Sequence, residues 1–305
     1  MTEPSLLLSF RDTFLVARFE LVRARRTWQA MAVILLFAIA SGGSTYGFVQ
    51  ILLEIENNLA ASLGVPPTDA PGALTDVLLG SDDLRRVMRG LINDWSLIDD
   101  VLKWPLVAVF HFWTSLILVP WLAAFVAADT ISEDVRTRAV RFELLRTGRL
   151  ELVYGRFLGQ CLLLAISLFL AGLTSFAVAW WTMILNDPLY VMYGLLAMSL
   201  RAFLWGLPFL GLGVACSESV KSPTWARILA LIGTTGMFIG HGILIWLRTK
   251  GYGLYVSPLI GVSPASWIRS LWAGGLDTAL AGLYLPAFAM VLVGLGYLVL
   301  ARRDA

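Results

Sequence analysis

The stretch Ala128–Gly159 reads ADTISEDVRTRAVRFELLRTGRLELVYGRFLG and lies between two long apolar runs. It holds six arginines and five acidic residues. Each charge at the centre of a bilayer costs roughly 2.5–3.5 kcal/mol on the insertion scale, so this stretch cannot lie in lipid. Short basic loops of membrane proteins stay in the cytoplasm. We therefore predict that Ala128–Gly159 is a mostly helical cytoplasmic loop between two membrane spans.

The composition of the rest of the chain indicates an integral membrane protein. Hydrophobic residues make up 58% and charged residues only 14%, whereas soluble domains carry about 25% charged residues. Apolar runs close to the spanning length of about 20 residues recur along the chain. We predict an all-α polytopic membrane protein, a single domain over residues 1–305, with six transmembrane helices: Trp28–Ile51, Pro105–Ala128, Phe157–Leu185, Ala202–Cys216, Ile228–Leu247 and Leu280–Leu300. The fourth can extend back past Arg201 into Leu189–Leu200.

The distribution of charge predicts the orientation of these spans. With both termini inside, 15 of the 23 Lys and Arg residues fall on the cytoplasmic side. The opposite loop Glu54–Lys103 has nine acidic residues against four basic ones. The positive-inside rule therefore predicts that Met1 and Ala305 are both cytoplasmic. We expect a multi-pass protein of a bacterial-type inner (plasma) membrane.

The segment before the first span, residues 5–27, is too charged to insert and too apolar for a solvated tail. Apolar residues recur at helical spacing, and Arg11, Arg18 and Arg25 repeat every seven residues between them. This pattern favours an interfacial helix with snorkelling arginines. An ordinary basic flank is the alternative.

The outer loop, residues 54–104, contains a second amphipathic helix. Ser81 can cap it, and an apolar stripe follows at steps of three or four residues. The stripe consists of Leu84, Met88, Leu91, Trp95 and Ile98. Such a stripe outside the membrane must be covered by the rest of the protein, by a second copy, or by an external protein.

Residues for catalysis are sparse. The chain has no G-x-x-x-x-G-K-[ST] loop, no H-E-x-x-H and no G-x-S-x-G. Its histidines, His111 and His241, lie in spans and are best explained by hydrogen bonding between helices, a metal or proton-relay pair being the alternative. The spans as bounded above contain no Asp or Glu, which argues against a proton- or sodium-driven carrier. Arg201 is expected at the outer interface, near lipid headgroups.

Several motifs together resemble the type-2 ABC exporter permeases. Glu133-Asp134-Val135-Arg136, then Phe142–Thr147, then Tyr154–Gly159 follow the order of that family before its third span. Ser217–Pro223 resembles its short loop after span four, and Ala301–Asp304 resembles its R-R-D ending. The resemblance covers the whole chain and is closest to the subgroup linked to multicopper-enzyme maturation. The chain departs from the family at Arg138-Ala139, where Gly-Thr is frequent.

This resemblance implies a permease subunit that exports an unidentified substrate, driven by a separate ATPase subunit that binds ATP and Mg. The coupling helix would lie in residues 129–156 and meet the ATPase through Glu133, Asp134, Arg136, Arg138, Arg141, Glu143 and Arg146. A second permease copy would complete the pathway, and residues 251–278 would form short re-entrant helices. On the chain itself we expect no catalytic, cofactor-binding or metal site, and no nucleic-acid partner.

Two other functions stay open on the residues alone. The chain could be a scaffold that relays ATPase motion to an outer protein through the acidic loop Glu54–Lys103. It could also be a membrane enzyme acting on lipids, for which polar residues clustered at one membrane face are expected.

Overall fold

The computed structural model describes residues 9–26, 28–64, 66, 71–72, 95–139, 143–144 and 147–303. Within these residues the chain is helical and has no strand. Six helical stretches are long and apolar enough to cross a membrane, which confirms the prediction of an all-helical chain with six such segments. They are Met31–Ser62, Leu106–Thr137, Arg149–Thr182, Pro188–Ser219, Pro223–Val262 and Gly275–Arg302.

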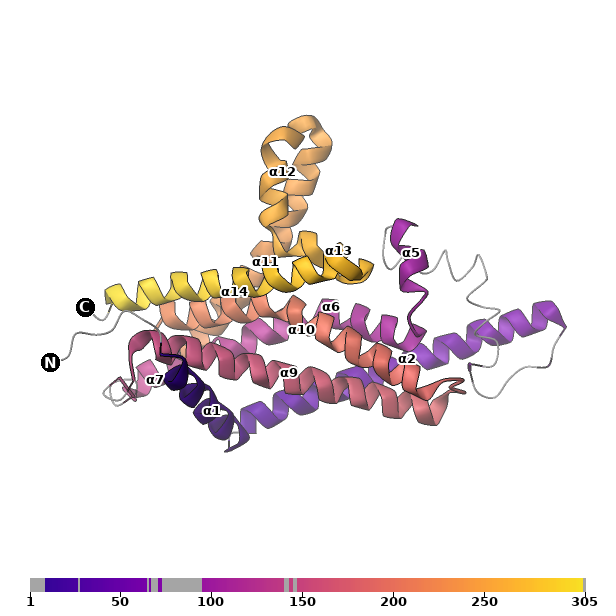
Figure 1. Cartoon of the computed structure of the whole chain (residues 1–305), viewed down its shortest axis with the longest axis horizontal. Coiled ribbons are helices and arrows are strands. Elements are labelled where there is room, and N and C mark those ends of the chain that lie inside the picture. The colour runs from indigo at the N-terminus through magenta and orange to yellow at the C-terminus, as the bar shows by residue number, and fades with distance from the viewer. Residues whose placement is uncertain are drawn as a thin grey trace.

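Five long helices run along the molecule, and a sixth leaves the bundle toward one side (Figure 1). The five are α2 (Trp28–Leu63), α6 (Leu106–Ala127), α9 (Arg149–Thr182), α10 (Pro188–Ser219) and α14 (Gly275–Arg303), and the sixth is α11 (Pro223–Leu247). The shorter elements are α1 (Phe10–Arg26), α5 (Trp95–Val101), α7 (Ser132–Thr137), η1 (Arg248–Tyr252), α12 (Gly253–Val262), η2 (Pro264–Trp267) and α13 (Ile268–Ala273).

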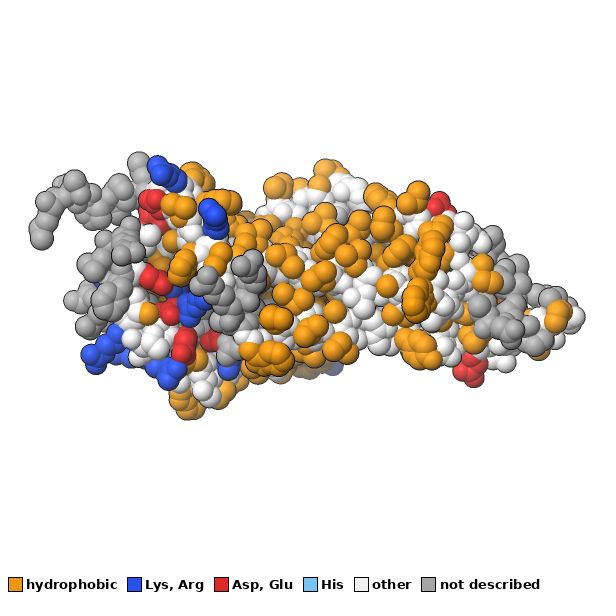
Figure 2. Space-filling view, turned by 90° about the horizontal axis from the view of Figure 1, so that it is seen from below, with side chains coloured by type: hydrophobic (Ala, Val, Ile, Leu, Met, Phe, Trp, Pro, Cys, Tyr) orange, Lys and Arg blue, Asp and Glu red, His pale blue; other side chains and the backbone are white. Residues whose placement is uncertain are grey.

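The two ends of the bundle differ in charge. Helices α1 and α7 lie at the same end as the last turns of α14 (Figure 1). Figure 2 shows basic and acidic side chains gathered at this end and an apolar band along the middle of the molecule. We call the end that holds α1 and α7 the charged end. An apolar band bounded by a charged end is what a bilayer requires, because charges are costly in its hydrocarbon core.

The fourth long helix extends past both ends of the predicted span Ala202–Cys216 and includes Leu189–Leu200, the extension past Arg201 that the sequence left open. Helix α10 begins at Pro188, where a missing N–H is tolerated, and the Asp187 side chain caps it by accepting a hydrogen bond from Tyr190 N at 3.1 Å. The helix is therefore long enough to include Arg201 and Glu218, both of which lie outside the predicted span. Glu56 likewise lies in α2 beyond the predicted span Trp28–Ile51, in a helix long and apolar enough to cross a membrane.

Arg201 lies deeper in the protein than expected. It is 8% exposed, and its guanidinium carbon lies 4.8 Å from the centre of the Trp104 ring. Trp104 precedes α6, so the long Arg201 side chain reaches from α10 back toward the start of a neighbouring helix. Protein side chains therefore cover this charge, and its location at the outer interface stays a prediction.

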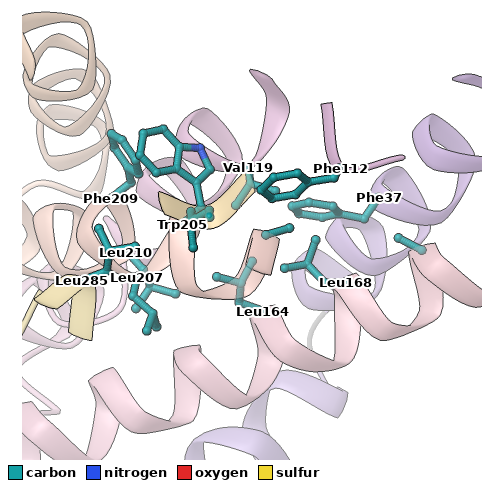
Figure 3. Close-up of a cluster of buried hydrophobic side chains, with 14 of the residues drawn as sticks. Phe37, Phe112, Val119, Leu164, Leu168, Trp205, Leu207, Phe209, Leu210 and Leu285 are labelled. Carbon is teal, nitrogen blue, oxygen red and sulfur yellow. The ribbon is translucent and has the colours of Figure 1, made fainter. Parts of the chain in front are cut away.

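The core is built around α10, which packs against α6, α9, α11 and α14. Figure 3 shows Trp205 and Phe209 of α10 among apolar side chains from neighbouring helices. The Trp205 indole donates a hydrogen bond to the carbonyl of Leu116 in α6 at 3.1 Å. Helices in lipid associate through close packing and hydrogen bonds, because the tails are as apolar as the helices. Helix α10 provides both.

The segment 251–278 forms η1, α12, η2 and α13 rather than one long helix. Gly251 has φ 95°, a left-handed conformation that favours glycine, and it turns the chain between α11 and α12. The end of α11 and α12 stand out from the side of the bundle (Figure 1). A re-entrant position for these short helices stays a prediction.

Candidate functional site at the charged end

Helix α7 follows α6 at the charged end and is only six residues long. Isolated helices this short are unstable, so contacts with the rest of the fold must hold it. The Ser217 hydroxyl of α10 accepts hydrogen bonds from the backbone N–H groups of Ile131 and Ser132, both at 2.9 Å. Arg138 ends the helix in a left-handed conformation with φ 61°. The start of α7 is thus fixed to α10.

A buried arginine connects α7 to α9. Arg156 is 2% exposed, and its guanidinium donates to the Asp134 carboxylate and to the Thr130 carbonyl. The same guanidinium donates to Glu143 Oε2 at 2.5 Å. From α1, Arg23 Nη1 donates to Asp134 Oδ2 at 2.8 Å. We call Arg23, Asp134, Glu143 and Arg156 the junction network. Buried charges persist only when paired and hydrogen-bonded, and here each charge has a partner.

Two glycines let α1 lie directly on α9. A Cβ added at Gly155 would lie 2.6 Å from Val16 Cβ, and one at Gly159 would lie 2.8 Å from Glu20 Cβ. This small-xxx-small spacing is a frequent means of close helix contact in membranes. The approach buries Glu20, whose carboxylate accepts a hydrogen bond from Gln160 at 3.3 Å. Burial raises the pKa of Glu20, and the positive charges of Arg156 and Arg23 partly oppose this rise.

The exposed side of α1 carries a row of aromatic side chains together with arginines. Phe10, Phe14 and Phe19 are all more than half exposed, while Thr13, Ala17, Glu20 and Ala24 are buried. Arg11 and Arg18 are exposed, and the side chain of Arg25 lies outside the described residues. The predicted interfacial location of α1 stays a prediction, and its exposed aromatic row is the feature that lipid would cover.

The seven predicted coupling residues separate into different roles. Asp134 and Glu143 belong to the junction network, whereas Glu133 and Arg136 form an exposed pair at 2.5 Å. Arg138 is exposed, and Arg141 and Arg146 lie outside the described residues. Sequence reasoning did not select Arg23 or Arg156. The sequence could have indicated Arg156 through its neighbours Gly155 and Gly159. Their spacing predicts that another helix packs closely on this face, and a charged residue there needs a partner.

A cavity of about 340 Å³ lies beside the junction network, between α1, α2, α6, α9 and α11. One part of its wall is charged and includes an ion pair between Arg227 and Asp129. The other part is apolar. The lining residues include Glu20, Arg23, Trp28, Val33, Phe125, Val126, Asp129, Glu133, Leu163 and Arg227. Such a mixed wall suits an amphiphilic molecule at the border between water and lipid.

Inside the bundle, His111 is the centre of a polar cluster that links four helices. Its Nδ1 lies 3.0 Å from Ser41 Oγ of α2, and its Nε2 lies 3.1 Å from Ser199 Oγ of α10. Ser175 of α9 completes the cluster, with its Oγ 2.6 Å from Ser41 Oγ. This agrees with the interpretation of His111 as a hydrogen-bonding residue between helices, whereas Nδ1 of His241 has no hydrogen-bond partner among the described residues. Among the residues that the structure describes, no three His, Cys, Asp or Glu side chains are grouped to hold a metal ion.

Part of the predicted outer helix is present as α5. Ile98 is 2% exposed, Leu97 and Val101 are also buried, and α5 contacts α13. Leu84, Met88 and Leu91 lie outside the described residues, as does the side chain of Trp95. The described part of the stripe therefore packs within the chain.

Hydrogen bonds and ion pairs at the charged end join α7 to three other helices. Asp134 links it to α9 and α1, and Ser217 links it to α10. Comparison of this chain with models of protein families and with curated proteins finds no match. Its function must therefore be inferred from its own geometry.

Proposed function

We propose that this chain is the membrane-spanning subunit of an ATP-driven exporter of the type-2 ABC class. The observation that carries the proposal is the junction network, in which one carboxylate, Asp134, accepts hydrogen bonds from arginines of both α1 and α9. An exporter driven by a separate ATPase needs a cytoplasmic element that is firmly joined to several spans. Helix α7 meets that need, because it lies between two spans and is fixed to three other helices.

In this proposal the ATPase docks on the exposed side of α7. Arg136 and Arg138 are exposed there and can complete a contact with acidic groups of a partner. ATP binding and hydrolysis, with Mg, take place on the ATPase. Packed helices respond to such a push by rigid-body shifts rather than by gradual deformation. Movement of α7 would therefore shift α9 and α10 together and change the pathway along them.

A second copy of the chain completes the proposed exporter. Helices α11 and α12 expose large apolar side chains, among them Ile239, Ile243, Leu254 and Tyr255. Lipid or a two-fold related copy can cover this surface, and a dimer would place a pathway between equivalent surfaces. The inner membrane, with both termini cytoplasmic, is the location that the charge distribution favours.

Export is favoured over the relay of motion to an outer protein by the position of α5. Its buried residues Leu97, Ile98 and Val101 are already used in contacts within the chain. An external partner would then have to bind elsewhere in the acidic outer loop.

The test is charge reversal on α7. We expect Arg136→Glu combined with Arg138→Glu to lower the amount of ATPase that co-purifies with the chain, and the MgATP hydrolysis of the complex, at least tenfold. Only an exposed ion pair is lost within the chain, and such pairs contribute at most about 1 kcal/mol, so the thermal stability should change little. The ATPase is identified by mass spectrometry through its own phosphate-loop motif.

The matched control is Lys250→Glu, an exposed charge in η1 outside α7, which should leave both measurements unchanged. Docking on α7 would be contradicted if the double variant retained the full amount of ATPase. It would also be contradicted if Lys250→Glu lost as much ATPase and MgATP hydrolysis as the double variant.

A further inference from the structure

Glu218 stands in the last turn of α10 and is completely buried, with an exposed fraction of 0%. Neither oxygen of its carboxyl group has a hydrogen-bond partner among the residues that the structure describes. Other buried acids differ in this respect. Asp134 is paired with two arginines, and Glu56 accepts hydrogen bonds from Gly72 N. Glu218 is therefore an exception that needs its own explanation.

The space around Glu218 is closed by α14. A Cβ added at Gly296 would lie 1.9 Å from Glu218 Oε2 and 2.7 Å from Ala215 Cα. The missing side chain of Gly296 thus leaves the volume that the carboxyl group fills. On α9, Tyr154 is the titratable group that interacts electrostatically with Glu218, and its hydroxyl faces Gly294 of α14. No described Lys, Arg or His forms an ion pair with Glu218.

An ionised carboxylate in these surroundings would be unstable. The effective cost of burying an unpaired charge is several kcal/mol, and a buried acid avoids that cost by keeping its proton. We propose that Glu218 is a proton-binding site, which holds a proton as a neutral carboxylic acid while α14 packs on α10. When the two helices separate and water enters, the acid ionises and its proton passes to water.

Binding and release of this proton are linked to the packing of the helices. Because the packed arrangement binds a proton that the separated one does not, rising pH must favour separation of α10 and α14 at the charged end. The site lies at the end where α7 is attached to α10 through the neighbouring residue Ser217. The inference goes beyond the proposed function, since it depends on the surroundings of Glu218 and not on what drives the helices.

Infrared spectroscopy of the purified full chain in lipid nanodiscs tests the protonation directly. At pH 7 the wild type should show the carbonyl band of a protonated carboxylic acid that shifts in heavy water. Glu218→Gln should remove the part of this band that comes from Glu218, because the variant keeps the shape of the side chain but has no titrating proton. The same substitution in a Glu20→Gln background, which lacks another buried acid, should remove an equal intensity. Absence of the band in the wild type, or an unchanged band in Glu218→Gln, would overturn the proposal.

Distance measurements test the link to helix separation. Spin labels at Lys221→Cys, after α10, and at Arg302→Cys, near the end of α14, occupy exposed positions at the charged end. Cys161 and Cys216 are replaced by Ala in this background. Electron–electron resonance should show a shift to longer distances as the pH rises into the alkaline range, and no shift in Glu218→Gln. A pH-independent distance in the labelled protein with native Glu218, or an equal shift in both proteins, would contradict the link.

Discussion

Helices α10 and α11 follow each other in the chain, and both are apolar and long enough to span a membrane. They nevertheless occupy different positions in the fold. Helix α10 is surrounded by other helices and buries large side chains such as Trp205, Phe209 and Leu210. Helix α11 lies at the edge and buries only Ala226, Ala230 and Thr234. Hydrophobicity therefore places a helix in the membrane without deciding whether lipid or protein surrounds it.

Glycine contacts show what separates the two helices. A Cβ added at Gly213 of α10 would lie 2.4 Å from the carbonyl oxygen of Ala124 in α6. At Gly240 of α11, a Cβ would meet no heavy atom within 4 Å. Small residues allow helices to approach closely only where the partner offers a matching surface. Glycine thus permits close packing at Gly213, whereas at Gly240 it faces no neighbouring residue that the structure describes.

The largest difference in stability between the two helices should appear when a tryptophan of each is replaced by alanine. Trp205 of α10 is 0% exposed and Trp246 of α11 is 58% exposed. We expect Trp205→Ala to lower the free energy of unfolding by about 3–5 kcal/mol, because it leaves a cavity in the core. Trp246→Ala should change it by less than about 0.5 kcal/mol. Denaturant titration of the protein in detergent measures both, and similar losses would show that α11 is packed as tightly as α10.

A smaller difference should separate the two glycines. Gly213→Ala should lower the free energy of unfolding by about 1–3 kcal/mol, because α6 and α10 must move apart to admit a methyl group. Gly240→Ala should be neutral or slightly stabilising, since alanine is the better helix former by about 1 kcal/mol. The same titration compares the two variants. Equal effects would mean that α11 has a close neighbour at Gly240, as it would in a dimer.

The smallest expected effect is a pH dependence of stability that comes from Glu20 of α1. Burial raises the pKa of Glu20 in α1 above its ordinary value of 4.5. A raised pKa means that the folded protein holds the proton more tightly than the unfolded one. The contribution to stability is therefore complete below the unfolded pKa and is lost as the pH rises through the folded pKa.

As the pH rises from 4.5 through the pKa of Glu20 in the folded protein, we expect the melting temperature of the wild type to fall. The melting temperature of Glu20→Gln should fall less, because this variant has no proton to lose. Thermal melts at a series of pH values upward from 4.5 measure the difference. Glu54→Gln, an exposed residue of α2, is the control and should follow the wild type. Parallel curves for wild type and Glu20→Gln would show that burial does not perturb Glu20.

Much of the fold could be predicted from local pattern. The six apolar runs coincide with six helices, because the length and hydrophobicity of a span are properties of a continuous segment. The start of α10 was left open in the sequence, because Arg201 separates the predicted span Ala202–Cys216 from the apolar stretch Leu189–Leu200. Only the position of Trp104, far away in sequence, shows how that charge is accommodated inside the bundle.

The candidate site was predicted in part. Asp134 stood out in a charged loop, yet its partners Arg23 and Arg156 come from two other helices. Glu218 belonged to a short polar loop in the sequence and lies in a sealed space in the structure. Pairing of charges depends on which helices are neighbours. A local sequence pattern does not show which helices these are.

The sequence by itself determined that the chain is helical, that six segments can span a membrane, and that the loop after the second holds more arginines than any other segment between spans. These follow from residue type and spacing, since backbone polar groups in lipid must be satisfied within each helix. The tertiary structure decided that α10 is central and α11 peripheral, that Asp134 is shared by two arginines, and that Glu218 has no hydrogen-bond partner among the residues that the structure describes. Burial and pairing arise from contacts between segments distant in the chain, so only the packed arrangement of helices can set them.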